Sequence, residues 1–319
     1  MHSPPPDFQP IEGVTARAHV PLSTLGRWRI GGPADLVLTP TSTRALGLAL
    51  VAARDLGKPV IIIGDGTNLL FADEGFRGTV IRIGPAIAAV RHSGPGRIEA
   101  EAGLWVPSFV RLAIGAGLGG VIHAIGIPGR LGGLVTMNGG SQRKGIGDHV
   151  EWVDAFDRDG VLHRLDRDQL NFGYRRSRLQ DGSLVVARAG FLLPHRAAEE
   201  SRREAIAILA ARRAKFPRIH ANCGSVFVSD PALYQKIGPP GQAIELAGLK
   251  GATQGSAQFS PDHANFIVNR GGATARDVLS LIALARDRVA AMTGVAMQAE
   301  VRYVAPNGAV TAAHEILGT

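Results

Sequence analysis

Hydrophobic residues recur along this chain with the periods of short strands and of helices that bury one face. Residues 41–56 carry helical spacing that stops at Gly57, and the apolar run 60–63 follows as a buried strand. An earlier strand ends at Leu38, and residues 79–83 predict a further one. The opening of the chain is therefore predicted to be a β-α-β-loop-β unit.

The middle of the chain predicts more strands than helices. Alternating segments bounded by turn residues are expected as strands at residues 88–92, 98–102, 152–156, 161–165 and 184–193. The sequence Asp157-Arg158-Asp159-Gly160 joins two of them as a hairpin turn. Residues 106–116 are predicted to form a short helix closed by Gly117.

Two longer helices are predicted in the last third of the chain. The polar stretch 194–200 is expected to link to a charged helix at residues 201–215, with a domain boundary there. Thr274 can cap a second helix, which Gly294 stops, and a final strand is predicted at residues 300–304. Strands in meander order with helices covering them indicate an α+β fold rather than a doubly wound parallel sheet.

Composition limits the partners and the compartment. The formal charge of +8 favours anionic ligands, and an aromatic content of 5% suits small phosphorylated molecules better than nucleic acid. A single cysteine excludes an internal disulfide, and the histidines lack metal-ligand spacing, so no catalytic metal is predicted. No stretch reaches the about 18 to 20 apolar residues that span a bilayer, and residues 1–10 do not resemble a signal peptide. We therefore expect a cytoplasmic protein that does not cross a membrane.

A first glycine-rich segment follows the strand predicted at residues 60–63. Gly64-Asp65-Gly66-Thr67-Asn68 offers successive backbone N–H groups that suit a phosphate or pyrophosphate. Leu69 stands where a dinucleotide-binding fingerprint has its third glycine, and no helix pattern begins there. An ordinary glycine turn explains the segment about equally well.

A second glycine-rich segment is denser than a single turn requires. It reads Gly126-Ile127-Pro128-Gly129-Arg130-Leu131-Gly132-Gly133, followed by Met137-Asn138-Gly139-Gly140. Because glycine costs conformational entropy on folding, this density favours close approach of the backbone to a flat cofactor over several consecutive tight turns.

Basic and nucleophilic residues supply further candidates. The run Phe172-Gly173-Tyr174-Arg175-Arg176-Ser177 suits a carboxylate or phosphate, although a solvated basic turn also explains it. Arg212-Arg213-Ala214-Lys215 is equally typical of a charged helix face. The run Asn222-Cys223-Gly224-Ser225-Val226-Phe227 lacks the spacing of a hydrolase nucleophile elbow, which disfavours acyl-enzyme chemistry. Cys223 is predicted to be a buried structural residue.

Short motifs follow one another in a fixed order between residues 21 and 304. The first are Arg29-Ile30-Gly31-Gly32-Pro33-Ala34, the turn at residues 64–70 and Asp73-Glu74-Gly75-Phe76-Arg77-Gly78. After them come G-I-P-G, M-N-G-G, F-G-Y-R, G-S-V-F, Gly248-Leu249-Lys250-Gly251, His263-Ala264-Asn265-Phe266 and Ala299-Glu300-Val301-Arg302. Together, in this order, they resemble the UDP-N-acetylenolpyruvoylglucosamine reductase family.

The resemblance implies a two-lobed FAD-binding domain of the vanillyl-alcohol oxidase/PCMH type followed by an α+β substrate-binding domain. The implied divisions are a flexible tail (1–20), two FAD-binding lobes (21–85 and 86–198), a substrate-binding domain (199–305) and a C-terminal extension (306–319). The short interval between Leu193 and Ser201 resembles the shorter type of the family, without a tyrosine-bearing insertion.

The resemblance also implies a chemistry in which NADPH reduces non-covalent FAD, and the flavin reduces the enolpyruvyl ether of a UDP-sugar to UDP-N-acetylmuramate for peptidoglycan. Ser225 would protonate C2, while Arg175 and Glu300 would polarise the carboxylate. The residues implied to contact FAD are Gly64, Asp65, Gly66, Thr67, Asn68, Leu69, Gly126, Ile127, Pro128, Gly129, Gly132, Gly133, Asn138 and Arg212. Those implied to contact the UDP-sugar are Tyr174, Lys215, Ser229 and His263.

Three segments differ from the usual family residues, at 25–27, 142–145 and 228–230. They leave open a paralogous FAD-dependent reductase acting on another nucleotide sugar. A non-catalytic nucleotide-binding protein on the same fold is a further alternative, although the joint presence of Ser225, Arg175 and Glu300 favours an enzyme. A monomer is expected, because the chain shows no long apolar seam.

Overall fold

The computed structural model describes residues 8–219 and 221–316, which divide into two compact units. Unit 1 comprises the described residues of Met1–Ala18, Leu36–Gly64 and Thr79–Arg212. Unit 2 comprises those of His19–Asp35, Asp65–Gly78 and Arg213–Thr319. The chain therefore enters each unit more than once, and three of the five divisions fall inside strands β1 (Val14–Pro21), β2 (Pro33–Pro40) and β5 (Phe76–Arg82).

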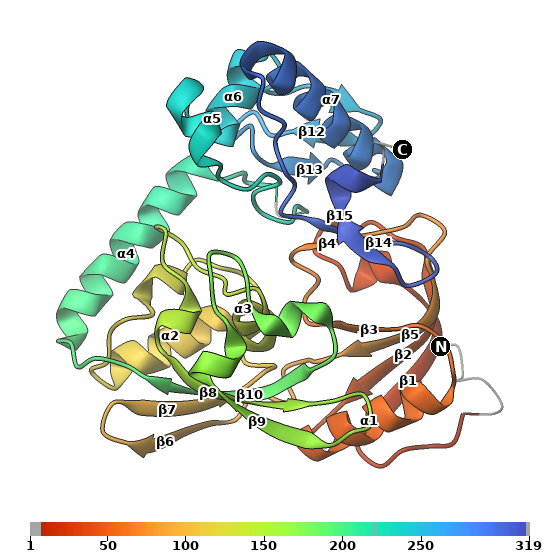
Figure 1. Cartoon of the computed structure of the whole chain (residues 1–319), viewed down its shortest axis with the longest axis vertical. Helices are drawn as coiled ribbons and strands as arrows, with labels where there is room; N and C mark the ends of the chain where they lie inside the picture. Colours follow the sequence, from red (N-terminus) through yellow and green to blue (C-terminus); the bar gives the residue numbers. More distant parts are fainter. Residues whose placement is uncertain (1–7, 220, 317–319) are drawn as a thin grey trace. The chain divides into compact units, whose positions relative to one another are not determined.

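Unit 1 contains a five-stranded sheet in the order β6-β7-β10-β8-β9 (Figure 1). Its neighbouring strands are antiparallel, and they are β6 (Val90–Gly94), β7 (Arg97–Glu101), β8 (Val150–Phe156), β9 (Leu162–Asp166) and β10 (Val185–Leu192). The hairpin predicted at residues 157–160 is confirmed, because it joins β8 to β9. Helices α2 (Val106–Gly115) and α3 (Leu131–Thr136) cover one face of this sheet (Figure 1).

The predicted opening β-α-β-loop-β pattern is also confirmed. Helix α1 (Thr43–Asp55) begins after Ser42, whose hydroxyl accepts a hydrogen bond from the Ala45 N–H. Strand β3 (Val60–Ile63) then pairs in parallel with β5, and the four-stranded sheet has the order β1-β2-β5-β3. The apolar face of α1, with Leu46 and Leu50, belongs to the continuous hydrophobic core of unit 1.

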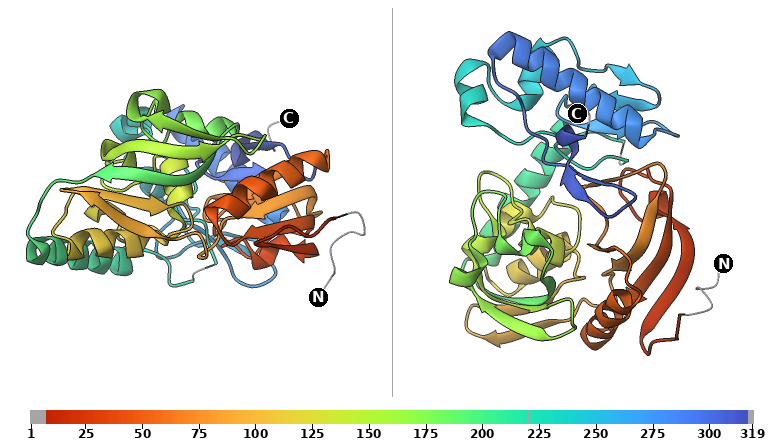
Figure 2. Two further views of the ribbon diagram at one scale, coloured as in Figure 1. Left: turned by 90° about the horizontal axis from the view of Figure 1, so that it is seen from below. Right: turned by 45° about the vertical axis from the view of Figure 1, so that its right-hand side comes forward.

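Unit 2 is built around helix α7 (Ala275–Thr293), which lies against a three-stranded antiparallel sheet (Figure 2). The strands of this sheet are β11 (Thr253–Gln254), β12 (Ala257–Phe259) and β13 (Ile267–Asn269). Thr274 and Asp277 form a capping box at the start of α7, and Gly294 ends it with φ 70°, as predicted.

The other elements of unit 2 are short. A second sheet has the order β15-β14-β4, with β4 (Leu69–Phe71), β14 (Arg302–Val304) and β15 (Val310–Ala312). Two short helices, α5 (Pro231–Lys236) and α6 (Pro240–Leu246), complete the α-helices of this part. The 3₁₀ turns of the whole described chain are η1 (Leu22–Thr24), η2 (Ile122–Ala124), η3 (Ile146–Asp148), η4 (Arg167–Leu170), η5 (Arg178–Asp181) and η6 (Ala313–Glu315).

Several predicted boundaries are wrong, among them the start of β5, which lies at Phe76 rather than at Thr79. Helix α4 (Ala198–Lys215) begins three residues before the predicted start, because Glu199 and Glu200 occupy its first turn, where acidic side chains favour a helix. The last predicted strand covers only Arg302–Val304, so Glu300 lies just before it. Within the described residues, no helix is long and apolar enough to cross a bilayer.

Candidate active site

The turn at residues 64–68 has the close backbone packing that its glycines predict. A Cβ added at Gly66, which has φ 57°, would lie 2.9 Å from the Cα of Gly26. A Cβ at Gly64 would lie 3.0 Å from Cγ of Arg130. Asn68 donates from Nδ2 to the Glu300 carbonyl (3.1 Å) and accepts from the Arg302 N–H (3.0 Å). This turn therefore disfavours a side chain at Gly66, a side chain at Gly64 would press on Arg130, and Asn68 holds the segment that carries Glu300.

The second glycine segment lies in unit 1, on both sides of the start of α3. A Cβ at Gly132 would come within 2.9 Å of the Ala102 Cβ, whereas a Cβ at Gly133 would have no atom within 4 Å. A Cβ at Gly126 would overlap the Cδ and Nε atoms of Arg212. Gly132 is therefore required by protein packing, a side chain at Gly126 would displace Arg212, and Gly133 leaves backbone open to a ligand.

Arg212 supplies a half-buried positive charge over Gly126. Burial lowers the pKa of its guanidinium to about 10, since desolvation disfavours the charged form. An anionic group bound beside it would offset that cost. The residues of unit 1 thus suit a cofactor with phosphate groups, by the open glycine backbone and by the charge of Arg212.

Asn138 and Arg175 both hold the loop at residues 138–147. The Asn138 Oδ1 accepts from the Gly147 N–H (2.9 Å), and its Nδ2 donates to the Gly173 carbonyl (2.7 Å). Arg175, with φ 54°, donates from Nη2 to the Gly140 carbonyl (2.6 Å). Its guanidinium also lies 5.4 Å from the ring centre of the exposed Tyr174.

Ser225 and Glu300 lie in unit 2 on two neighbouring backbone segments. Phe227 pairs with Ala299 in an antiparallel bridge, in which the Glu300 N–H donates to Val226 O (2.8 Å) and the Val228 N–H to Gln298 O (2.9 Å). Gly224, at φ 79°, turns the chain immediately before Ser225. The register of this bridge fixes the backbone of the serine relative to that of the glutamate.

Asn265 completes the backbone hydrogen bonds of Phe227. No functional role was predicted for this asparagine from the sequence. Its Oδ1 accepts from the Phe227 N–H (2.9 Å), and its Nδ2 donates to the Phe227 carbonyl (3.0 Å). Asn265 is 6% exposed and Phe227 1%. Asn265 belongs to the His-Ala-Asn-Phe motif, but the motif does not predict its hydrogen-bond partner Phe227, which lies 38 residues away in the sequence.

The residues implied to bind the UDP-sugar are placed differently from one another. His263 and Lys215 are close enough for Lys215 to contribute, after burial, to lowering the pKa of the imidazole. The ring of His263 contacts Phe216 and Phe266. Ser229 is exposed just before α5, and Tyr174 belongs to unit 1.

Cys223 is buried, as predicted for a structural residue. Its thiol contacts the carbonyls of Gly66 (3.6 Å) and Leu69 (3.5 Å), and burial raises its pKa to about 12. A thiol with this pKa stays protonated at neutral pH and is a poor nucleophile. The described residues contain no group of three or more His, Cys, Asp or Glu side chains that could hold a metal ion.

Two family models match separate parts of this chain. Residues 216–304 match the family model described as UDP-N-acetylenolpyruvoylglucosamine reductase, C-terminal domain. Residues 34–166 match the FAD binding domain model.

Individual relatives carry the same name. One from Corynebacterium glutamicum, named UDP-N-acetylenolpyruvoylglucosamine reductase 1, is 44% identical over 93% of this chain and 88% of its own length. One from Heliobacterium modesticaldum is 42% identical over 90% of each chain. The crystal structure of UDP-N-acetylenolpyruvylglucosamine reductase from Thermus caldophilus aligns with a TM-score of 0.75 and 32% identity, over 91% of this chain and 98% of that one. This chain therefore belongs to the UDP-N-acetylenolpyruvoylglucosamine reductase family.

Proposed function

We propose that this protein reduces UDP-N-acetylglucosamine enolpyruvate to UDP-N-acetylmuramate with NADPH and bound FAD, a step in the synthesis of peptidoglycan precursors. The observation that carries the proposal is identity of 44% over 93% of the chain with a relative of that name. The backbone bridge that joins the Ser225 and Glu300 segments supports it, since both residues are required by the proposed chemistry.

FAD is the cofactor of this enzyme, and when bound it would supply the redox chemistry that links NADPH to the enolpyruvyl group. We assign its binding to the two glycine segments. The residues that would hold it are Gly64, Asp65, Gly66, Thr67, Asn68, Leu69, Gly126, Ile127, Pro128, Gly129, Gly132, Gly133, Asn138 and Arg212. Arg212 would face a phosphate, because a cofactor anion offsets the cost of burying its charge.

The chain's own catalytic work is the movement of a proton and the control of charge. Ser225 would deliver the proton to C2, the carbon next to the carboxylate, after C3 has been reduced. Its side chain is half-buried, and its hydroxyl has no hydrogen bond within the described residues, so it is available to a substrate. Glu300 and Arg175 would orient and polarise the carboxylate, and the positive charge of Arg175 would stabilise the negative charge that develops on it.

We assign substrate contacts to Tyr174, Lys215, Ser229 and His263. Burial and the nearby Lys215 and Lys250 lower the pKa of His263, so its imidazole is neutral near pH 7. A neutral ring can accept or donate one hydrogen bond to a sugar or a base, while Lys215 offers a point charge for a phosphate. We further propose that the protein acts as a cytoplasmic monomer, away from membranes and without binding nucleic acid.

A second function is favoured by one segment of unit 1. Gln142 and Arg143 both have positive φ, 56° and 62°, within the loop that Arg175 holds through Gly140. This backbone is uncommon for residues other than glycine and asparagine, and it lies where the chain departs from the family's usual residues. A reductase for a different nucleotide sugar is therefore the second candidate.

An anaerobic absorption experiment tests the proposal. Purified protein is reduced with NADPH, and UDP-N-acetylglucosamine enolpyruvate is then added while the flavin band is followed. Bleaching of the band and its rapid return support the proposed function. Bleaching without return favours the second candidate, and protein that cannot be reconstituted with FAD contradicts both.

A further inference from the structure

The segment after Val304 folds back onto the segment that carries Glu300. Strand β15 pairs antiparallel with β14, and the pairs are Arg302 with Ala312, Tyr303 with Thr311 and Val304 with Val310. The turn η6 follows directly and brings Ala313 and His314 beside residues 299–301. The C-terminal extension is thus part of the structure around Glu300.

Backbone groups of Glu300 and of the residues on both sides of it have hydrogen-bond partners within the described part of the chain. The Glu300 N–H donates to Val226 O (2.8 Å), and its carbonyl accepts from Asn68 Nδ2 (3.1 Å). The Val301 carbonyl accepts from the Ala313 N–H (2.9 Å). The N–H of Ala299 donates to Nδ1 of His314 at 3.0 Å. Ala299 is 6% exposed, so this N–H depends on the imidazole for a partner.

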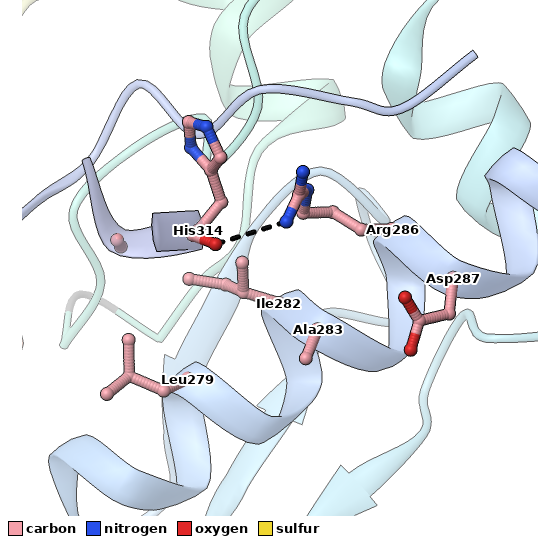
Figure 3. A pocket seen from close by; sticks show the side chains of 7 residues that line it. Leu279, Ile282, Ala283, Arg286, Asp287 and His314 are labelled. Atoms are coloured by element: carbon pink, nitrogen blue, oxygen red, sulfur yellow. Dashed lines mark hydrogen bonds between the residues drawn. The ribbon is translucent and has the colours of Figure 1, made fainter. Parts of the chain in front are cut away.

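His314 is itself held in place by Arg286 of α7. Arg286 donates from Nη1 to the His314 carbonyl (3.1 Å) and from Nε to the Met297 carbonyl (2.8 Å). Figure 3 shows both residues at a pocket that Leu279, Ile282, Ala283, Asp287 and Ala313 also line. One arginine therefore ties the turn that carries His314 to the residue two positions before Ala299.

We propose that His314 is a positioning residue for Glu300, which it holds through the N–H of Ala299. This inference rests on the proposed role of Glu300 in the reduction of the enolpyruvyl sugar. His314 would act through the backbone, because its Nδ1 accepts the hydrogen bond of the Ala299 N–H. A displacement of a catalytic carboxylate by about 1 Å can cost about a hundredfold in rate, so loss of the hydrogen bond at the Ala299 N–H should slow the step in which Glu300 takes part.

The contact requires a neutral imidazole. Nδ1 can accept the Ala299 hydrogen bond only when it carries no proton, and the remaining ring nitrogen then carries it. Burial lowers the pKa of His314, and Arg286 lowers it further, while Glu315 opposes the shift. Asp287 is the other charged group at the pocket. The contact is therefore fully present above about pH 6.5 and is lost as the pH falls from there through the folded-state pKa.

Two substitutions and one control test this role in the FAD-loaded protein. His314→Ala removes the acceptor, His314→Asn restores an acceptor near the place of Nδ1, and Glu315→Ala alters the exposed neighbour. Oxidation of the reduced flavin by the enolpyruvyl sugar should slow about tenfold or more in His314→Ala, and return to within about threefold of wild type in His314→Asn. Reduction of the flavin by NADPH should change less than about twofold in all three. In His314→Asn the second step should also lose the decline that wild type should show as the pH falls through the lowered pKa of His314.

Hydrogen exchange of the peptide that contains Ala299 supplies a readout that does not depend on activity. His314→Ala should speed exchange there by about tenfold or more, and His314→Asn should restore protection. Unchanged exchange in His314→Ala overturns the inference, and so does a slow second step that His314→Asn does not rescue. If wild-type flavin is not reoxidised by the enolpyruvyl sugar, the proposed function fails, while the exchange result still decides whether His314 holds Ala299.

Discussion

Asn265 allows the stability of the Ser225 segment to be tested quantitatively. Phe227 forms the centre of the bridge with Ala299, and the bridge bonds use the neighbours Val226 and Val228 rather than Phe227 itself. The N–H and carbonyl of Phe227 therefore depend on the carboxamide of Asn265. Both residues are buried, so in the intact protein bulk water does not reach these two backbone groups, and only the cavity left by deleting the carboxamide could admit a water beside them.

Replacing Asn265 with Ala leaves two buried backbone groups without partners. Each such group costs about 1–3 kcal/mol, which gives an upper range of about 2–6 kcal/mol for the pair. Because the two groups belong to one residue and a single water can enter beside them, we expect a loss of about 2–4 kcal/mol in the free energy of unfolding of unit 2. Asn265→Asp should cost at least as much, since the carboxylate would face the Phe227 carbonyl oxygen.

Urea unfolding at one fixed, saturating FAD concentration measures the loss, with circular dichroism as the signal. The matched control is Asn307→Ala, which removes an exposed asparagine that accepts only the Ala309 N–H (3.1 Å) and should cost about 0.5 kcal/mol. A loss below about 1 kcal/mol for Asn265→Ala, similar to the control, would refute the reasoning that Phe227 depends on this side chain.

Three further predictions address the cofactor, the proton and the pH. Ser225→Ala should leave the reduction of flavin by NADPH within about twofold and slow reoxidation by the enolpyruvyl sugar about a hundredfold, measured by stopped flow; an unchanged second step removes Ser225 from its role. Gly126→Ala should weaken FAD binding by about tenfold or more in apoprotein titrations, because its methyl group would displace Arg212, whereas Gly115→Ala meets no atom within 4 Å and should not. Burial, then Lys144, His149 and Arg175, lower the pKa of His123 to about 4, while Asp148 opposes the shift. Wild type should therefore lose about 3 kcal/mol of stability as the pH falls from 6.5 to 4. In acid unfolding His123→Phe should show a shallower loss of stability with pH, and a slope identical to that of wild type contradicts the assignment to His123.

The regular elements could be predicted because their signals are local. The capping box of Thr274, the stop at Gly294 and the hairpin turn at residues 157–160 all depend on residues within a few positions of one another. The short helices α3, α5 and α6 were not predicted, because about two turns give too few apolar positions to define a period. The division into two units could not be predicted from the sequence either, because the chain enters each unit more than once.

In the candidate site, too, residues with local sequence signals could be predicted, whereas residues whose partners are distant in the sequence could not. The glycine turn at residues 64–68 could be proposed as a phosphate site from sequence because its signals, a strand that runs into two closely spaced glycines, are local, although an ordinary turn explained them about equally well. The reason for Gly126 could not, because Arg212, which occupies the space of its missing side chain, follows 86 residues later. In the sequence, Asn265 and His314 look like ordinary polar loop residues. Only the fold shows that each side chain forms a hydrogen bond with a buried backbone N–H.

These two side chains explain how a short, irregular backbone can position catalytic groups. The bridge between Phe227 and Ala299 is isolated, so it lacks the flanking ladder that fixes register in a longer strand. Asn265 binds the outward-facing groups of Phe227, and His314 binds the outward-facing N–H of Ala299, so each side of the bridge has its own side-chain partner. Since Ser225 and Glu300 lie within two residues of these points, substitutions at Asn265 and His314 should alter the proton-transfer step through the backbone, before they affect flavin reduction.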